Sequence, residues 1–344
     1  MTAEWSEIVK ILTFQSGYNT SVVMIGVSLL GMAAGVTGVF VLLRERAMVS
    51  DAIAHSTLPG LALAFLVLHA LGIERSFGWL LFGAVLSGLF GLLLIHLLSH
   101  YTRLAEEASI GAVLSVFFGA GVVLLSVIQS LGSSGSAGLS HFIYGHTASM
   151  LREDAQRLVI INATAIGISA LLFKEFRLLC FDTEFARVQG WSVRLLDAVM
   201  LCLLLVVVVF GLQSVGMLLI VALLIIPATA ARFWTNSLRT MLVVAGFLGT
   251  LSGYLGAAIS AFFPRMPTGA VIVLSAGVFF SISFLVAPER GLLVGLYRQV
   301  AVRFRIVREH LLRSFYEEAE IQGTDLSMFE MPINAIGRAW LLLP

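Results

Sequence analysis

The chain has 344 residues, of which 59% are hydrophobic and only 12% are charged, and its mean hydropathy is +0.99. This composition excludes a water-soluble globular domain and indicates an integral membrane protein. The net charge of +1 leaves no polybasic surface for binding nucleic acid. The two cysteines, Cys180 and Cys202, indicate neither a disulfide framework nor a Cys-rich metal knuckle.

Nine segments of the chain are apolar and long enough to cross a bilayer as helices. Lipid offers backbone groups no hydrogen-bond partners, and the segments lack the alternation of barrel strands, so helices are the only fold that fits. We therefore expect an all-α integral membrane protein, a polytopic bundle of about 8–9 transmembrane helices. The segments are 21–43, 52–70, 77–99, 109–130, 156–173, 195–212, 214–231, 240–262 and 268–287. The break at 213–216 leaves open whether the chain forms two helices there or one interrupted helix.

The distribution of Lys and Arg predicts the orientation of the bundle. With the N-terminus outside, fifteen basic residues fall in the inner connections and five in the outer ones, leaving the distant Arg338 aside. We therefore expect three parts: an outer arm at 1–20, a transmembrane domain at 21–290 and a cytoplasmic extension at 291–344. Within the extension, residues 293–320 are basic and then acidic, which predicts a surface helix.

Two ionisable residues, Asp51 and His55, lie near the start of the second segment. Such residues are costly inside a membrane and are therefore the first candidates for function. A spacing of four residues places them on one face of a helix, within reach of a common atom. A carboxylate and a neutral imidazole suit a divalent metal such as Mn²⁺, Zn²⁺ or Fe²⁺. Alternatively, Asp51 caps the helix and His55 bonds a neighbouring carbonyl group, and spacing alone does not decide between the two.

The inner connection that begins at Phe181 predicts a short amphipathic helix. Asp182 and Glu184 place negative charge at its N-terminus, Ala186 lies in its middle, and Gly190 ends it. An inner helix with an apolar face can dock on a partner protein or rest on lipid, and both interpretations stay open.

The sequence lacks the motifs of two enzyme classes. The only lysines, Lys10 and Lys174, do not stand in a Walker A motif, so any ATP that drives this protein must bind a separate subunit. No His-Glu pair occurs, which excludes the H-E-x-x-H motif of a zinc protease. Gly132-Ser-Ser-Gly135, with Ser134 as nucleophile and His141 as base, is a weak match to an intramembrane serine protease and reads more naturally as a Gly/Ser-rich loop.

Several separated motifs, taken in order, resemble the permease subunits of the manganese, zinc and iron family of ABC importers. The resemblance covers roughly residues 20–290. The matching pieces are Ser50-Asp-Ala-Ile-Ala-His-Ser-Thr-Leu-Pro-Gly60, Ala108-Ser-Ile-Gly111, Phe181-Asp-Thr-Glu-Phe-Ala-Arg-Val-Gln-Gly190, Gln213-Ser-Val-Gly-Met-Leu-Leu-Ile-Val-Ala-Leu-Leu-Ile-Ile-Pro-Ala-Thr-Ala-Ala231 and Pro267-Thr-Gly-Ala270.

The resemblance implies a type II ABC importer fold and a role in ATP-driven import by alternating access. It implies that Asp51 and His55 line the path of a divalent metal and that residues 181–191 form the helix that couples to the ATPase. The implied partners are an ABC ATPase subunit, an extracytoplasmic metal-binding protein, a second permease copy or sister chain, and the lipid of a bacterial cytoplasmic (inner) membrane. The chain itself would be no enzyme and would bind no cofactor tightly, because ATP acts through the partner.

Other functions remain as alternatives. A permease for iron chelates or cobalamin has a related architecture but would not need Asp51 and His55. A secondary transporter would use an ion gradient and need no ATPase. The carboxylate and imidazole donors suit manganese, zinc and iron alike, so the sequence does not select among these metals.

Overall fold

The computed structural model of the protein describes residues 18–72, 77–130, 152–263 and 266–322. In these ranges the secondary structure is helical, without strands. The chain divides into two compact units, one ending at Ser283 and the other beginning at Phe284.

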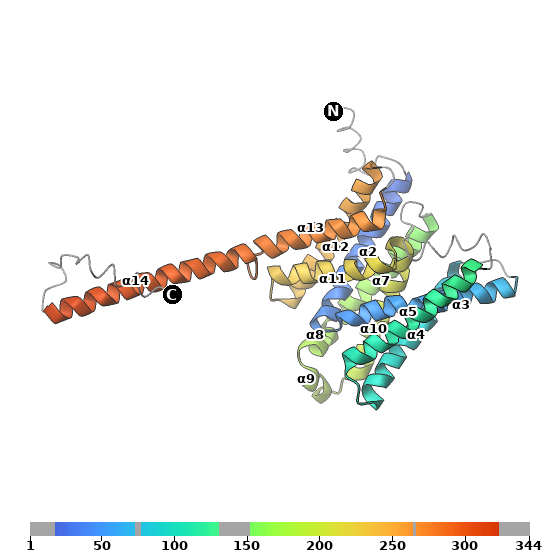
Figure 1. The fold of residues 1–344 in the computed structure, drawn as a ribbon, viewed down its shortest axis with the longest axis horizontal. Helices are drawn as coiled ribbons and strands as arrows, with labels where there is room; N and C mark the ends of the chain where they lie inside the picture. Colours follow the sequence, from blue (N-terminus) through green and yellow to red (C-terminus); the bar gives the residue numbers. More distant parts are fainter. Residues whose placement is uncertain (1–17, 73–76, 131–151, 264–265, 323–344) are drawn as a thin grey trace, which may run out of the picture. The chain divides into compact units, whose positions relative to one another are not determined.

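Each of the nine predicted segments corresponds to a helix in the described ranges, which confirms the all-α fold class (Figure 1). These helices are α2 (Tyr18–Leu43), α3 (Ala47–Ala70), α4 (Phe77–Tyr101), α5 (Glu106–Ser130), α7 (Arg152–Leu171), α10 (Val193–Val215), α11 (Met217–Trp234), α12 (Leu238–Phe262) and α13 (Thr268–Val286). The other described helices are α8 (Phe173–Phe181), α9 (Thr183–Val188) and α14 (Leu292–Gln322).

Not all nine helices are simple straight spans. Among the described residues, seven helices are long and apolar enough to cross a membrane. Helix α7 bends by 67° into α8, and this bent pair counts as an eighth span. Helices α10 and α11 are separated by Gly216, whose φ of +95° interrupts the helix, so the break predicted at 213–216 yields two helices. The apolar part of α11, Leu219–Trp234, is shorter than a full span.

Helix α2 is the central element of the first unit and packs against α7, α10, α11 and α12. Helices α2 and α12 approach until their backbones touch. A Cβ atom built on Gly31 would lie 2.1 Å from the carbonyl oxygen of Gly249, and one built on Gly35 would lie 2.4 Å from that of Ala245. Lipid gives apolar helices little reason to associate, so close backbone packing through small residues holds the bundle together.

Helices α3, α4 and α5 form a second packed group within the same unit (Figure 1). A Cβ atom on Gly60 of α3 would lie 2.2 Å from the carbonyl oxygen of Gly83 on α4. The hydroxyl group of Ser87 on α4 donates a hydrogen bond of 2.6 Å to the carbonyl group of Ser56 on α3. Helix α3 is therefore clamped by its neighbours at the level of Ser56, next to His55.

The second unit contains α14, a helix of 31 residues that matches the helix predicted at 293–320. Arg298 Nη2 donates a hydrogen bond of 3.1 Å to the carbonyl oxygen of Pro288, which ties the first turns of α14 to the connection before it. Large apolar side chains on α14, including Leu293, Tyr297 and Phe304, are exposed.

We expect Gly31→Ala to destabilise the protein by about 1–3 kcal/mol, because the added methyl group would overlap the backbone of α12. The measurement is the midpoint of thermal unfolding in detergent micelles. Gly277→Ala in α13 is the matched control, because a Cβ atom at Gly277 meets no atom within 4 Å. Equal midpoints for Gly31→Ala and the wild type would contradict the close packing of α2 and α12.

Candidate functional site

The structure brings Asp51 and His55 together on one face of α3. The Nε2 atom of His55 lies 3.4 Å from the Oδ1 atom of Asp51. The His55 side chain is 12% exposed, whereas that of Asp51 is 46% exposed. The pair therefore places a partly exposed oxygen donor and a largely buried nitrogen donor next to each other on one face of the helix.

The surroundings of His55 hold its ring in place but leave one ring nitrogen without a hydrogen-bond partner among the described residues. The ring meets the edge of Phe118 on α5, with 4.9 Å between the ring centroids and an angle of 82° between the planes. Its Nδ1 atom is buried and has no hydrogen-bond partner in the described part of the chain. In addition, Pro59 lacks an N–H group, so the carbonyl oxygen of His55 does not receive the regular hydrogen bond from four residues later.

The capping alternative for this pair does not agree with the geometry. Helix α3 begins at Ala47 and its N-cap residue is Arg46, so Asp51 lies inside the helix, beyond the first turn. The ring nitrogens of His55 face Asp51 and a partnerless position, not a carbonyl group. Helix capping therefore does not explain the positions of Asp51 and His55.

The pair alone is an incomplete metal shell. Among the described residues, no group of three His, Cys, Asp or Glu side chains lies close enough to hold a metal ion. His96 and His100, which the sequence also places four residues apart, stack with their ring centroids 5.7 Å apart on the exposed surface of α4. Within the described ranges, no third His, Cys, Asp or Glu side chain joins Asp51 and His55.

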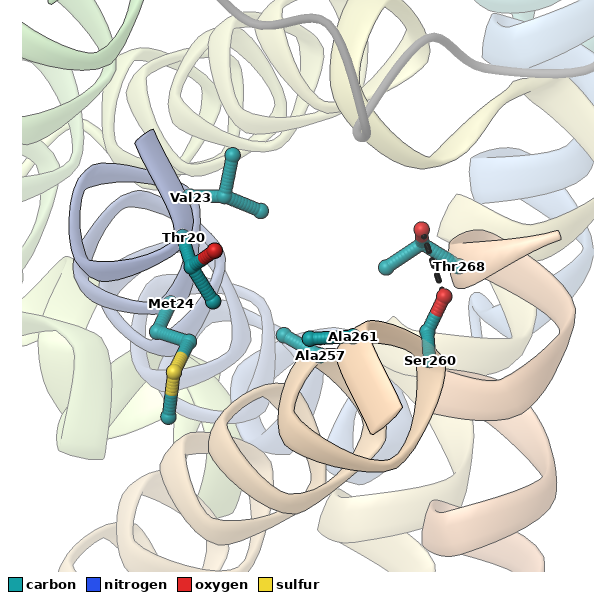
Figure 2. Close-up of a pocket in the computed structure, with 7 residues that line it drawn as sticks. All are labelled: Thr20, Val23, Met24, Ala257, Ser260, Ala261 and Thr268. Atoms are coloured by element: carbon teal, nitrogen blue, oxygen red, sulfur yellow. Dashed lines mark hydrogen bonds between the residues drawn. The ribbon is translucent and has the colours of Figure 1, made fainter. Parts of the chain in front are cut away.

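A cavity of about 130 Å³ lies elsewhere, between α2, α12 and α13 (Figure 2). Its polar atoms are hydroxyl groups: Ser260 Oγ lies 2.9 Å from Thr268 Oγ1, and Thr20 faces them from α2 in Figure 2. The remaining lining residues are Val23, Met24, Ala257 and Ala261. Because this lining carries no charge and no imidazole, the cavity is a poor match for a divalent transition metal.

The predicted inner helix exists as α9, and its ends follow the sequence signals. The Asp182 side chain caps the helix by accepting a hydrogen bond of 2.9 Å from the backbone N–H group of Phe185. At the other end Gly190 has φ +85°, and the N–H groups of Gly190 and Trp191 donate to the carbonyl oxygens of Arg187 and Ala186. This pattern is a Schellman motif, which glycine completes without strain.

Helix α9 presents an apolar surface to solvent. Phe185 and Val188 of α9 are exposed, Val188 to 84%, as is Phe181 at the end of α8, whereas Ala186 is buried and anchors α9. Glu184 Oε1 and Arg187 Nη1 form a surface ion pair at 3.0 Å. An exposed apolar helix of this kind is a candidate docking surface.

An ionic cluster that the sequence did not predict lies close to α9. A spacing of three residues would allow Arg194 to pair with Asp197, but the Asp197 carboxylate pairs instead with Arg44 and Arg46. These arginines are 153 and 151 residues away in the chain, so no local spacing could have indicated them. Ser134 and His141, named for the protease alternative, lie outside the described residues.

The sequence matches a known protein family and several characterised relatives. Residues 18–287 match the model of a protein family described as the ABC 3 transport family. The chain is 42% identical over 302 residues to the manganese transport system membrane protein MntC of Bacillus subtilis, covering 88% of this chain and 68% of the relative. It is 40% identical over 285 residues to the zinc transport system membrane protein TroC of Treponema pallidum, covering 83% and 94% of the two chains.

Solved structures agree with these relatives. PsaBC from Streptococcus pneumoniae, determined in complex with Fab, superposes with a TM-score of 0.71 and 30% identity, covering 83% of this chain and 97% of that one. A metal-chelate type ABC transporter in an inward-facing conformation has a TM-score of 0.55 and 17% identity, covering 76% and 84%, which shows a shared fold alone. The resemblance found in the sequence is therefore confirmed, and the chain belongs to the ABC 3 transport family.

Proposed function

We propose that the chain is the membrane-spanning permease subunit of an ATP-driven importer for a divalent first-row metal, with manganese, zinc and iron as candidates. The observation that carries this proposal is the Asp51 and His55 pair, with an oxygen and a nitrogen donor 3.4 Å apart on one face of a membrane helix. Relatives named for manganese and zinc transport support the same substrate class. The metal is the substrate and passes through, and the chain catalyses no reaction itself.

The incomplete shell suits a transport site. Binding must be firm enough to admit the ion and weak enough to release it, which a saturated shell would prevent. A second permease copy, identical or a sister chain, would bring a second carboxylate and imidazole to the exposed side of Asp51. Two carboxylates and two imidazoles are donor types that suit Mn²⁺, Zn²⁺ and Fe²⁺. The metal is thus proposed to bind between the paired permeases, with exchangeable water in any remaining position so that the ion can still leave.

The other partners follow from the surfaces at the two ends of the bundle. The apolar surface of α9 is proposed to sit on the ABC ATPase subunit, because the chain has no Walker A motif of its own. A metal-binding protein outside the cell would deliver the ion. Of the outer arm expected at 1–20, residues 1–17 lie outside the described ranges and residues 18–20 belong to α2. The expected location is the cytoplasmic membrane of a bacterium, with residues 291–344 as an inner extension beyond the permease domain at 21–290.

A chelate permease and a gradient-driven transporter make different demands on the structure. A bulky iron chelate or cobalamin does not require a carboxylate and imidazole pair. A gradient-driven carrier does not require an exposed docking helix such as α9. The pair and the helix together favour the metal importer.

We expect Asp51→Ala and His55→Ala each to reduce uptake of the transported metal by at least about tenfold, because each removes one of its donors. The measurement is uptake of radioactive Mn²⁺, Zn²⁺ and Fe²⁺ by cells that carry the whole transport operon. Met48→Ala is the matched control, because this residue is exposed on the same helix one turn before Asp51. Unchanged uptake of all three metals in both variants would contradict the metal path and favour chelate or gradient-driven transport.

We expect Val188→Asp to reduce the amount of ATPase that copurifies with the permease by at least about tenfold, because a charge would be buried in the docking surface. The measurement is the ratio of ATPase to permease after purification in mild detergent. Val302→Asp makes the same change at an exposed site on α14 and serves as the control. Full copurification of the Val188→Asp variant would show that α9 is not the ATPase contact.

A further inference from the structure

A compact ionic cluster joins helices that are distant in the chain. The carboxylate of Asp197, in the second turn of α10, is shared by two arginines: its Oδ1 atom lies 3.4 Å from Arg44 Nη2, and its Oδ2 atom pairs with Arg46 Nη1. The three side chains are only 17–20% exposed. Partly buried charges of this kind are strongly coupled, and removing one member leaves the others uncompensated.

The same two arginines extend the cluster to two more helices. Arg46 Nε lies 2.8 Å from Glu106 Oε1 in the first turn of α5. Arg44 Nη1 donates a hydrogen bond of 3.1 Å to the backbone carbonyl oxygen of Leu179 in α8. The cluster therefore contains two positive and two negative side chains and connects α5, α8 and α10 to the turn between α2 and α3.

This turn is built to hold both arginines rigidly. The N–H groups of Glu45 and Arg46 donate to the carbonyl oxygens of Leu42 and Val41, as in a Schellman motif. Glu45 occupies the left-handed position with φ +59°, which glycine normally fills. A non-glycine residue keeps this strained conformation only where the surrounding structure fixes the backbone. The turn between α2 and α3 is therefore rigid.

In chain connectivity, the cluster links α9 to the helix that carries Asp51 and His55. On one side, α9 is followed by Gln189–Ser192 and then by α10, so Asp197 lies in the second turn of the helix that α9 leads into. On the other side, Arg46 is the N-cap of α3, five residues before Asp51 and about 13 Å along the helix from His55. A displacement of α9 can thus reach the Asp51 and His55 pair through one carboxylate.

We propose that Asp197, held by Arg44 and Arg46, is the positioning residue that transmits movement of α9 to α3 and so to the metal-binding pair. This inference rests on the proposed function of α9 and of Asp51 with His55. Asp197 touches neither metal nor ATPase; it couples α10 to the α2–α3 turn. Its charge matters because only an anion can hold both guanidinium groups.

The test is the number of metal ions transported per ATP hydrolysed by the complete transporter in proteoliposomes. Asp197→Asn is expected to keep ATP hydrolysis near the wild-type rate while this ratio falls by about tenfold. Asp197→Glu is expected to restore much of the ratio, because it restores the charge. Arg194→Ala, an exposed cation three residues earlier on α10, is the matched control and keeps the wild-type ratio.

Arg46→Gln changes the arginine that joins Asp197 to α3, and it is also expected to lower the number of metal ions transported per ATP. This variant tests the proposal even where the Asp197→Asn transporter does not assemble. A wild-type ratio in a folded Asp197→Asn or Arg46→Gln transporter would overturn the proposal. So would a parallel loss of hydrolysis and transport, since a merely structural cluster lowers both together.

A second measurement does not depend on metal transport. Spin labels at exposed Arg187 on α9 and exposed Met48 on α3, in a variant without Cys180 and Cys202, report the distance between α9 and α3 with and without trapped nucleotide. With the link intact, α3 follows α9 and the distance stays nearly constant; in Asp197→Asn it changes on trapping. An equal response in both proteins overturns the link, whereas failure of wild-type metal uptake alone would count against the proposed function.

Discussion

The cost of leaving polar groups unsatisfied in lipid is the constraint on which the rest of this structure depends. It makes every membrane-crossing segment helical, and it removes the hydrophobic drive that would bring helices together in water. The helices associate instead through close backbone contacts at Gly31, Gly249 and Gly60. Against this apolar background the few ionisable side chains stand out, because each must be paired or serve a purpose.

The ionisable side chains of the bundle fall into two kinds of site. Asp197 is balanced by two arginines in a closed cluster, as expected for charges that organise helices. Among the described residues, Asp51 and His55 pair with each other and with no further charged side chain, which is compatible with donors that receive a passing ion. The two sites lie at successive levels of α3, since Arg46 caps the helix whose second turn carries Asp51. Helix α3 is therefore the connection that we propose between α9 and the pair.

Much of the fold could be predicted because it follows from local chemistry. Runs of apolar residues predicted the nine helices, and Asp182 with Gly190 predicted both ends of α9. The 67° bend after Leu171 could not be predicted, because no proline or glycine marks it. The partners of Asp197 were also missed, since they depend on how α2, α3 and α10 pack and not on spacing. The spacing of Asp51 and His55 correctly placed them on one face, but their role stays a prediction.

In the proposed function, His55 and Asp51 hold the transported metal between two permease copies. Pulsed electron paramagnetic resonance of Mn²⁺ added to the purified, nucleotide-free complex of permease and ATPase tests this arrangement. We expect one bound Mn²⁺ for two permease chains, with a coupling to imidazole nitrogen that disappears in His55→Ala. Bound Mn²⁺ without nitrogen coupling, or with a coupling that survives in His55→Ala, would contradict it.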